Sequence, residues 1–312
     1  MRATAIREPD ASGARRVAGA LDGSTGSHAL AYLGLSCMSC CWAAGFILGK
    51  VVLADFTPLA AATARYAVAV AVLLPFAVRA RPRDGLGRAA LPLACMVVAG
   101  GILYPWLFLL ALSCTTATNT SLLIALNPVF TMLLVPLAGE RFDPRRLGGI
   151  VLALAGAATV ITHGDVAKVA VSQGDLIAVT AAVAWATFNV ASRGVAGRLA
   201  PPFVNTVVYG GGGLALGAIG WTERPLAQLA AARTSAIGAI AAMALVSSVV
   251  AGHLFLTGIR KVGVARTVVF VYVVPVLTAL ASALFLDERL HGAQVIGGAA
   301  VLAGVWWTNR AG

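Results

Sequence analysis

Two stretches of the sequence decide the fold: ERFDPRRLGGIVLALAG at residues 140–156 and ERLHGAQVIGGAAVLAG at residues 288–304. Each stretch begins with Glu-Arg, and each has glycines nine and sixteen positions after the Glu. The matched glycines are Gly149 and Gly156 in the first stretch and Gly297 and Gly304 in the second. The agreement in spacing indicates that one structural unit occurs twice in the chain.

Matches extend outward from both stretches. Pro128 and Thr131 correspond to Pro275 and Thr278 at one constant spacing, which we call the proline offset. Near the start of each copy, a slightly shorter spacing pairs Trp42 with Trp185, Lys50 with Arg193 and Pro58 with Pro201. We call this second spacing the tryptophan offset. We therefore predict two copies, over residues 29–163 and 174–309.

The composition places both copies in a membrane. The hydrophobic share is 59% and the charged share is 11%, whereas a soluble domain has about 25% charged residues. Mean hydropathy is +0.89. Twelve acidic and 23 basic side chains cannot cover a water-soluble surface of this size, so the lipid bilayer must cover much of it.

Ten apolar stretches approach the roughly 20 residues needed to cross a bilayer. They lie at residues 29–49, 58–78, 89–112, 115–137, 146–163, 174–193, 202–221, 235–259, 265–286 and 292–309. Because five spans per copy is an odd number, the second copy must be inverted in the membrane. The sequence thus predicts an all-α polytopic membrane protein whose inverted five-helix repeats surround a central cavity, an arrangement typical of alternating-access carriers.

The charged residues predict the orientation. With the N-terminus inside, 17 of the 23 Lys and Arg residues fall in cytoplasmic segments and five on the other side, while Arg65 lies within a span. This bias predicts that both termini are cytoplasmic. Residues 1–28 are polar and are expected to form a disordered tail. The basic clusters lie between apolar runs, so the net charge of +11 indicates topology and no nucleic-acid partner.

The string from Pro128 through Glu140-Arg141 to Gly149 and Gly156, with its copy, resembles the drug/metabolite transporter superfamily in its EamA-type, ten-helix branch. Trp42 and Arg65 also stand where that family carries such residues. The resemblance covers residues 29–309 and implies a carrier of the bacterial inner membrane that exports small metabolites. Within the family the chain is most similar to aromatic amino-acid exporters, which implies amino-acid substrates. A single chain would be sufficient for transport.

Two polar side chains in predicted spans are candidates for substrate binding, because ionisable groups are costly in a membrane. Arg65 could attract a substrate carboxylate, or its guanidinium could instead snorkel or bond helix-end carbonyls. His253 could couple export to protons, or it could be a neutral residue bonded to a carbonyl. No Asp or Glu appears deep in a span, so we expect facilitated passage rather than a paired-acid proton relay.

The fourth span contributes Asn119 and Asn127, which fall on one face at helical spacing. Asn127 precedes Pro128, and Tyr272 precedes the matching Pro275 by three positions. Prolines at equivalent places in two halves predict a binding region. Hydrogen bonding between helices is the alternative role for these polar residues.

Aromatic residues make up 7% of the chain, so their placement is informative. Trp42 and Trp185 are repeat counterparts near the middle of the first and sixth spans, and Asn189 lies one turn beyond Trp185. Tyr104 precedes Pro105 in the third span. These residues predict an aromatic-lined cavity for apolar side chains, with packing against lipid or the core as the alternative.

Other functions find less support in the sequence. It contains no His-Glu-x-x-His and no Gly-x-Ser-x-Gly, so we expect no catalytic residues, no metal and no cofactor. Cys37-x2-Cys40-Cys41 lacks a His or acidic partner on its span and is interpreted as packing. Glu140 and Glu288, each beside an Arg, are interpreted as helix-end ion pairs, with a gating role as the alternative. Exporters of drugs or nucleoside-type metabolites, a channel and an intramembrane enzyme remain the rival functions.

Overall fold

The computed structural model describes residues 11–83, 85–134, 136, 144–162 and 172–310. Over these ranges every regular element is helical and no strand occurs. The helices of the first half are α1 Ala11–Val52, α2 Pro58–Arg79, α3 Ala90–Met96, α4 Tyr104–Cys114, α5 Ala117–Ile124, α6 Asn127–Leu134 and α7 Leu147–Ile161. Those of the second half are α8 Gln173–Val195, α9 Pro201–Ile219, α10 Pro225–Ala231, α11 Thr234–Ala242, α12 Ala251–Val262, α13 Val264–Val271, α14 Val273–Phe285 and α15 Gly292–Arg310.

The apolar helices confirm a polytopic membrane protein. Among the described residues, seven helical stretches are long and apolar enough to cross a membrane, and three further apolar helices are shorter. The seven are Leu30–Val52, Pro58–Arg79, Gly87–Cys114, Ala117–Leu134, Gln173–Val195, Pro201–Glu223 and Thr234–Val262. The shorter ones are Leu147–Ile161, Val273–Phe285 and Gly292–Trp307. Each of the ten predicted ranges overlaps one of these stretches.

Capping residues explain where several helices begin. Thr57, Thr116 and Ser172 each accept a hydrogen bond from a backbone N–H in the first turn of α2, α5 and α8, as N-cap hydroxyls do. Pro58 follows Thr57 at the first helical position, where its missing N–H costs nothing. At Thr115 the backbone is extended, which separates the third predicted span from the fourth.

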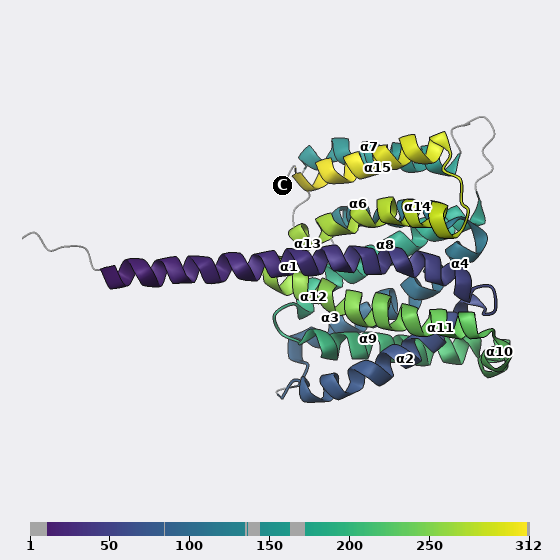
Figure 1. Cartoon of the computed structure of the whole chain (residues 1–312), viewed down its shortest axis with the longest axis horizontal. Helices are drawn as coiled ribbons and strands as arrows, with labels where there is room; N and C mark the ends of the chain where they lie inside the picture. The colour runs from purple at the N-terminus through teal and green to yellow at the C-terminus, as the bar shows by residue number, and fades with distance from the viewer. Residues whose placement is uncertain (1–10, 84, 135, 137–143, 163–171, 311–312) are drawn as a thin grey trace, which may run out of the picture.

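Helix α1 differs from the expectation for the N-terminal tail. It begins at Ala11 and runs without interruption to Val52, so residues 11–28 are helical where an irregular segment was expected. Four alanines and two arginines in the segment favour helix, whereas its four glycines disfavour it. In Figure 1 this part of α1 projects well beyond the other helices.

The glycines of the opening motif establish the symmetry of the two halves. A Cβ on Gly156 would stand 2.6 Å from the Gly297 carbonyl oxygen, and one on Gly304 would stand 2.5 Å from that of Gly149. The order along one helix is reversed along the other, so α7 and α15 are antiparallel. Because Gly149 corresponds to Gly297 and Gly156 to Gly304, the contacts are those of a two-fold axis relating inverted copies.

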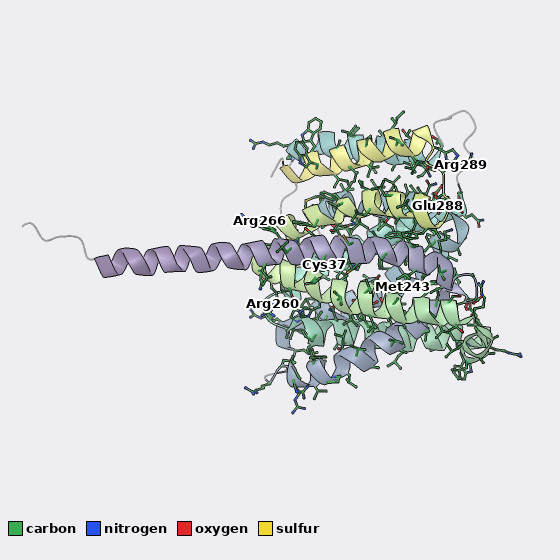
Figure 2. All side chains as sticks on the ribbon, viewed as in Figure 1. Cys37, Met243, Arg260, Arg266, Glu288 and Arg289 are labelled. Atoms are coloured by element: carbon green, nitrogen blue, oxygen red, sulfur yellow. The ribbon has the colours of Figure 1, made fainter. Side chains whose placement is uncertain are left out.

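The other helices also pair across the two halves. Helix α2 packs antiparallel to α9, with Leu59 against Gly220 and Tyr66 against Gly213. Figure 1 places α2 and α9 at one edge of the bundle, α7 and α15 at the opposite edge, and α1 between them. Arg260 and Arg266 lie at the end from which α1 projects, whereas Glu288 and Arg289 lie at the other end (Figure 2). We call the latter the Glu288 end.

Candidate transport cavity

Two π-helical segments occur at corresponding places in the halves. Val97–Leu103 joins α3 to α4, and Met243–Val250 joins α11 to α12. When the first segment is shifted along the sequence by the proline offset, it falls within the second. A π segment leaves backbone carbonyls without their usual partners and is frequent at functional sites. Here the Gly100 carbonyl accepts the Tyr66 hydroxyl, and the Ser248 carbonyl accepts the Tyr209 hydroxyl.

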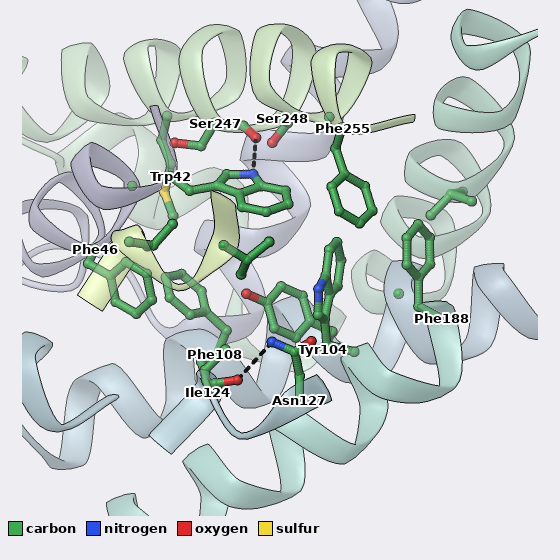
Figure 3. A pocket seen from close by; sticks show the side chains of 18 of the residues that line it. Trp42, Phe46, Tyr104, Phe108, Ile124, Asn127, Phe188, Ser247, Ser248 and Phe255 are labelled. Carbon is green, nitrogen blue, oxygen red and sulfur yellow. Dashed lines mark hydrogen bonds between the residues drawn. The ribbon is translucent and has the colours of Figure 1, made fainter. Parts of the chain in front are cut away.

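The next span of each half is broken just before a proline. Helix α5 ends at Ile124 and α6 begins at Asn127, while α13 ends at Val271 and α14 begins at Val273. Pro128 cannot donate to the carbonyl four positions earlier. The Asn127 side chain supplies the missing donor, with its Nδ2 3.0 Å from the Ile124 carbonyl oxygen (Figure 3).

These distorted segments enclose a cavity between the two halves. Its volume is about 90 Å³, which is room for about six waters at roughly 15 Å³ each. Both π segments and both helix breaks contribute lining residues, among them Gly100, Ser247, Asn127 and Val271. The cavity therefore lies where the helices are least regular, and the described residues that line it include no Asp or Glu.

Aromatic rings form most of one wall. Trp42 and Trp185 meet edge to face with ring centroids 5.6 Å apart, and Tyr104 lies 4.6 Å from Trp185. The Trp42 indole N–H donates to the Ser247 carbonyl (Figure 3), which fixes the ring against the π segment. Since Trp42 and Trp185 are repeat counterparts in contact with each other, the wall lies close to the axis that relates the halves.

A second pair of counterparts lies on the same axis. Tyr66 and Tyr209 match at the tryptophan offset, and their rings stack with centroids 4.7 Å apart. The Arg65 guanidinium carbon lies 4.9 Å from the centre of the Tyr66 ring. Arg65 is the charged residue among the described residues that line the cavity. Its side chain is 7% exposed.

The structure brings five of the nine predicted binding residues together. Those that line the cavity are Trp42, Arg65, Tyr104, Asn127 and Trp185. Asn189 lies one contact away, because its Nδ2 donates to the Asn127 Oδ1 at 3.2 Å. His253 and Tyr272 are not among the lining residues, although each is next in sequence to one of them, Gly252 and Val271.

Asn119 belongs to a different group, a polar network at the Glu288 end. Its side chain accepts a hydrogen bond from Gln294 at 2.7 Å and lies 3.4 Å from Asp175. Lys50 donates to the Thr115 carbonyl in the same region. Asp175 lies in the first turn of α8 and not deep in a span, yet it is fully buried, because α8 begins against Thr115.

The ion pair expected between Glu288 and its neighbour Arg289 does not account for the contacts that the Glu288 carboxylate makes. Its carboxylate accepts hydrogen bonds from the backbone N–H groups of Ala117 and Thr118 at 2.9 and 3.2 Å, and from the Thr118 hydroxyl at 2.9 Å. It therefore caps α5, as an anion at a helix N-terminus does. Glu140 and Arg141, the matching residues, lie outside the described residues.

Several lining residues were missed by sequence reasoning, chiefly Tyr66, Phe108, Phe188, Asn205, Tyr209 and Phe255. The tryptophan offset would also have identified Tyr66 and Tyr209. Asn205 has no counterpart of its own type, since the same offset leads to Ala62. Across the described residues no group of three or more His, Cys, Asp or Glu could hold a metal ion.

A small, aromatic-lined cavity at the axis between inverted halves is the architecture of a small-solute carrier. The comparisons with known proteins agree: the EamA-like transporter family matches residues 29–162 and 172–310. The chain belongs to that family and is a membrane transporter.

Two relatives and one solved structure are also similar to this chain. The chain is 28% identical over 285 residues to "Uncharacterized transporter YyaM" of Bacillus subtilis, covering 89% of this chain and 93% of the relative. It is 24% identical over 273 residues to "Probable amino-acid metabolite efflux pump" of Escherichia coli, covering 85% and 90%. A crystal structure with 19% identity matches with a TM-score of 0.55 over 87% of this chain and 96% of the other, which shows the fold alone.

Proposed function

We propose that the protein exports small metabolites across a bacterial inner membrane by alternating access, and that its substrates are amino acids with aromatic or other large apolar side chains. The observation that carries the proposal is the pairing, in one cavity, of a buried guanidinium with a wall of aromatic rings. An amino acid of this type presents a carboxylate to Arg65 and an apolar side chain to Trp42, Tyr104 and Trp185.

Two further observations support this substrate class. The Escherichia coli relative is named as an amino-acid metabolite efflux pump, although at low identity. The cavity lining contains Arg65 and no lysine, whereas a carrier of phosphate esters would need several cations to meet the phosphates. One cation is suited to a substrate with a single carboxylate.

We also propose that both termini face the cytoplasm. The excess of Lys and Arg in alternate loops supports this orientation, and Figure 2 places Arg260 and Arg266 at the end opposite Glu288. In this orientation Lys50 and Glu288 face the outside of the cell. Transport from the α1-projecting end toward the Glu288 end would then be export.

Flux through the purified protein in proteoliposomes tests the proposal. Labelled amino acids, nucleosides and cationic drugs are compared with and without a pH gradient. We expect saturable flux of large neutral amino acids that the gradient does not change. Flux of cationic drugs alone would contradict the substrate class, and flux that never saturates would indicate a channel.

A variant with a matched control tests the role of Arg65. Loss of hydrogen bonds to a charged group costs roughly 10- to 100-fold in affinity, so Arg65→Ala should raise the apparent KM for amino acids by about that factor. Arg79→Ala alters an exposed arginine at the end of the same helix and should leave KM unchanged. An unaltered KM in a folded Arg65→Ala protein would refute the carboxylate contact.

A further inference from the structure

Two unpaired hydrogen-bond donors share the cavity. Among the described side chains, the buried nitrogen and oxygen atoms without a hydrogen-bond partner include Arg65 Nε and Asn205 Nδ2. Both residues line the cavity, and they are 7% and 3% exposed. A buried donor left unpaired destabilises the protein, and more so if it is charged, so two in one cavity require an explanation.

The two donors lie on paired helices of opposite halves. Arg65 is on α2 and Asn205 is on α9, and the stacked rings of Tyr66 and Tyr209 connect these helices next to them. Asn205 is one turn from Tyr209 and therefore on the same face of α9. The Asn205 and Tyr209 side chains approach Gly252 of α12, where an added Cβ would stand 3.5 Å from Asn205 Nδ2. A larger residue at Gly252 would thus crowd this part of the cavity.

The fold does not itself require these donors. The tryptophan offset pairs Arg65 with Val208 and Asn205 with Ala62, and both counterparts are buried apolar residues. Each half thus tolerates an apolar side chain at the position where the other half has a donor. Unpaired donors that are costly and not required for the architecture are suited to an acceptor supplied by a ligand.

We propose that Arg65 and Asn205 together form a binding site for the carboxylate of the substrate, with Arg65 supplying the charge and Asn205 a second N–H donor from the opposite half. This assignment rests on the proposed transport function and adds Asn205 to it. A carboxylate has two acceptor oxygens and one charge, which match one guanidinium and one amide. Because the donors come from both halves, the bound carboxylate connects α2 to α9.

Binding of a simple acid to the purified full-length protein tests the site without requiring transport. The probes are 3-phenylpropionate and 3-phenylpropanamide, which differ only at the carboxyl group. Tryptophan fluorescence reports binding, because Trp42 and Trp185 line the cavity. We expect the acid to bind at least about 10-fold more tightly than the amide, since a hydrogen bond to a charged group is the stronger one.

Variants in α9 test whether Asn205 supplies the second N–H donor. Asn205→Ala, which copies the repeat counterpart Ala62, should weaken binding of the acid by roughly 10-fold and leave binding of the amide unchanged. Thr206→Ala is the matched control, because Thr206 bonds the Pro202 carbonyl on its own helix and does not line the cavity. Asn205→Asp preserves the size and should abolish acid binding, since a second carboxylate would compete for Arg65.

The outcomes separate this site from the transport function. Equal binding of acid and amide, no binding of the acid, or equal affinity in Asn205→Ala and Thr206→Ala would each overturn the carboxylate site. If the acid binds as expected and no amino acid moves across the vesicle membrane, the proposed transport function fails while the site stands. Saturable amino-acid flux unaffected by Asn205→Ala refutes the site and leaves transport in place.

Discussion

The two halves of the molecule share their backbone and differ in their chemistry. Both have a π segment, a span broken before a proline and a glycine-lined crossing at corresponding positions. Their cavity side chains have diverged, so that Arg65 corresponds to Val208, Asn205 to Ala62 and Asn127 to Val274. In the proposed mechanism the shared features let a helix change shape, and the unshared side chains recognise the solute.

This division is what alternating access requires. Two end states of similar free energy arise when each half can take the shape of the other, so the backbone irregularities must be present in both. In the proposed site the substrate is bound once, at the axis, so its donors need to occur once. Polar groups in a membrane are costly, which favours a single set.

The largest expected effect on stability comes from the glycines at which α7 and α15 cross. In Gly156→Ala the new Cβ would meet the Gly297 carbonyl oxygen and the Val301 amide nitrogen at 2.6 Å each, and backbone atoms of α15 cannot rotate away. We expect a loss of about 2–3 kcal/mol, in the range measured for overpacked cores. Thermal unfolding in detergent measures the loss.

Gly304→Ala and Gly238→Ala complete that experiment. Gly304 faces Ala153 and the Gly149 carbonyl across the same axis, so its replacement should cost about as much as that of Gly156. Gly238 in α11 has nothing within 4 Å of a new Cβ and should gain up to about 1 kcal/mol from helix propensity. A large difference between Gly156→Ala and Gly304→Ala would show that the halves do not pack symmetrically.

The helix break in the first half gives the next effect. Asn127→Val copies the second-half residue Val274 and removes the donor to the Ile124 carbonyl and the acceptor for Asn189. We expect a loss of about 1–3 kcal/mol from the groups left unpaired. Asn127→Val with Asn189→Val replaces both polar side chains by apolar ones of similar size, which removes the second unpaired group and should recover part of the loss. No recovery in the thermal unfolding of the double variant would show that Asn189 is not coupled to Asn127.

The Glu288 cap on α5 should contribute less to stability than the hydrogen bonds at the helix break. Glu288→Gln retains one acceptor oxygen but loses the charge that faces the N-terminus of α5, which is worth about 1–2 kcal/mol in a partly buried setting. Arg289→Ala is the control, because Arg289 is exposed and the carboxylate of Glu288 is bonded to α5. Equal thermal destabilisation by the two variants would support the ion pair instead of the cap. Glu140→Gln measured beside them reports whether the matching carboxylate in the first half contributes similarly.

The repeat, the prolines and the tryptophan pair could be predicted from the sequence because each is a matter of residue type and spacing. The roles of Asn119 and Asn127 could not be separated in this way. Both fall on one face of a continuous helix, but α5 ends at Ile124 and α6 begins at Asn127. The break directs Asn127 into the cavity and leaves Asn119 in the network at the Glu288 end.

Asn205 and the π segments were missed for a related reason. A π segment has no residue requirement of its own, so the sequences of Val97–Leu103 and Met243–Val250 are those of ordinary apolar helix. Asn205 follows two prolines near the start of a span and resembles any polar residue at a helix end. Its burial depends on how α9 packs against α2 and α12, which is information that the local sequence does not carry.

The smallest effect concerns a loop that the halves do not share. Asp55 between α1 and α2 accepts hydrogen bonds from the backbone N–H and the side chain of Arg233 at 3.0 Å, whereas its counterpart at the tryptophan offset is Arg198. These bonds hold the pKa of Asp55 below its usual value of 3.8. A carboxyl group with a lowered pKa stabilises the folded protein above its unfolded pKa, and this contribution is lost as the pH falls through the folded value.

Asp55→Asn should therefore lower Tm slightly at pH 7, and the difference from the unchanged protein should close as the pH falls below about 4. High salt should also reduce the difference, because the Arg233 side chain is solvent-exposed and charges at such a surface are screened beyond about 3 Å at 1 M salt. Thermal unfolding of the two proteins across this pH range measures the effect. A difference that does not shrink as the pH falls below about 4 would mean that Asp55 acts through the shape of the α1–α2 loop and not through its charge, and the loop would then belong with the shared backbone features rather than with the diverged side chains.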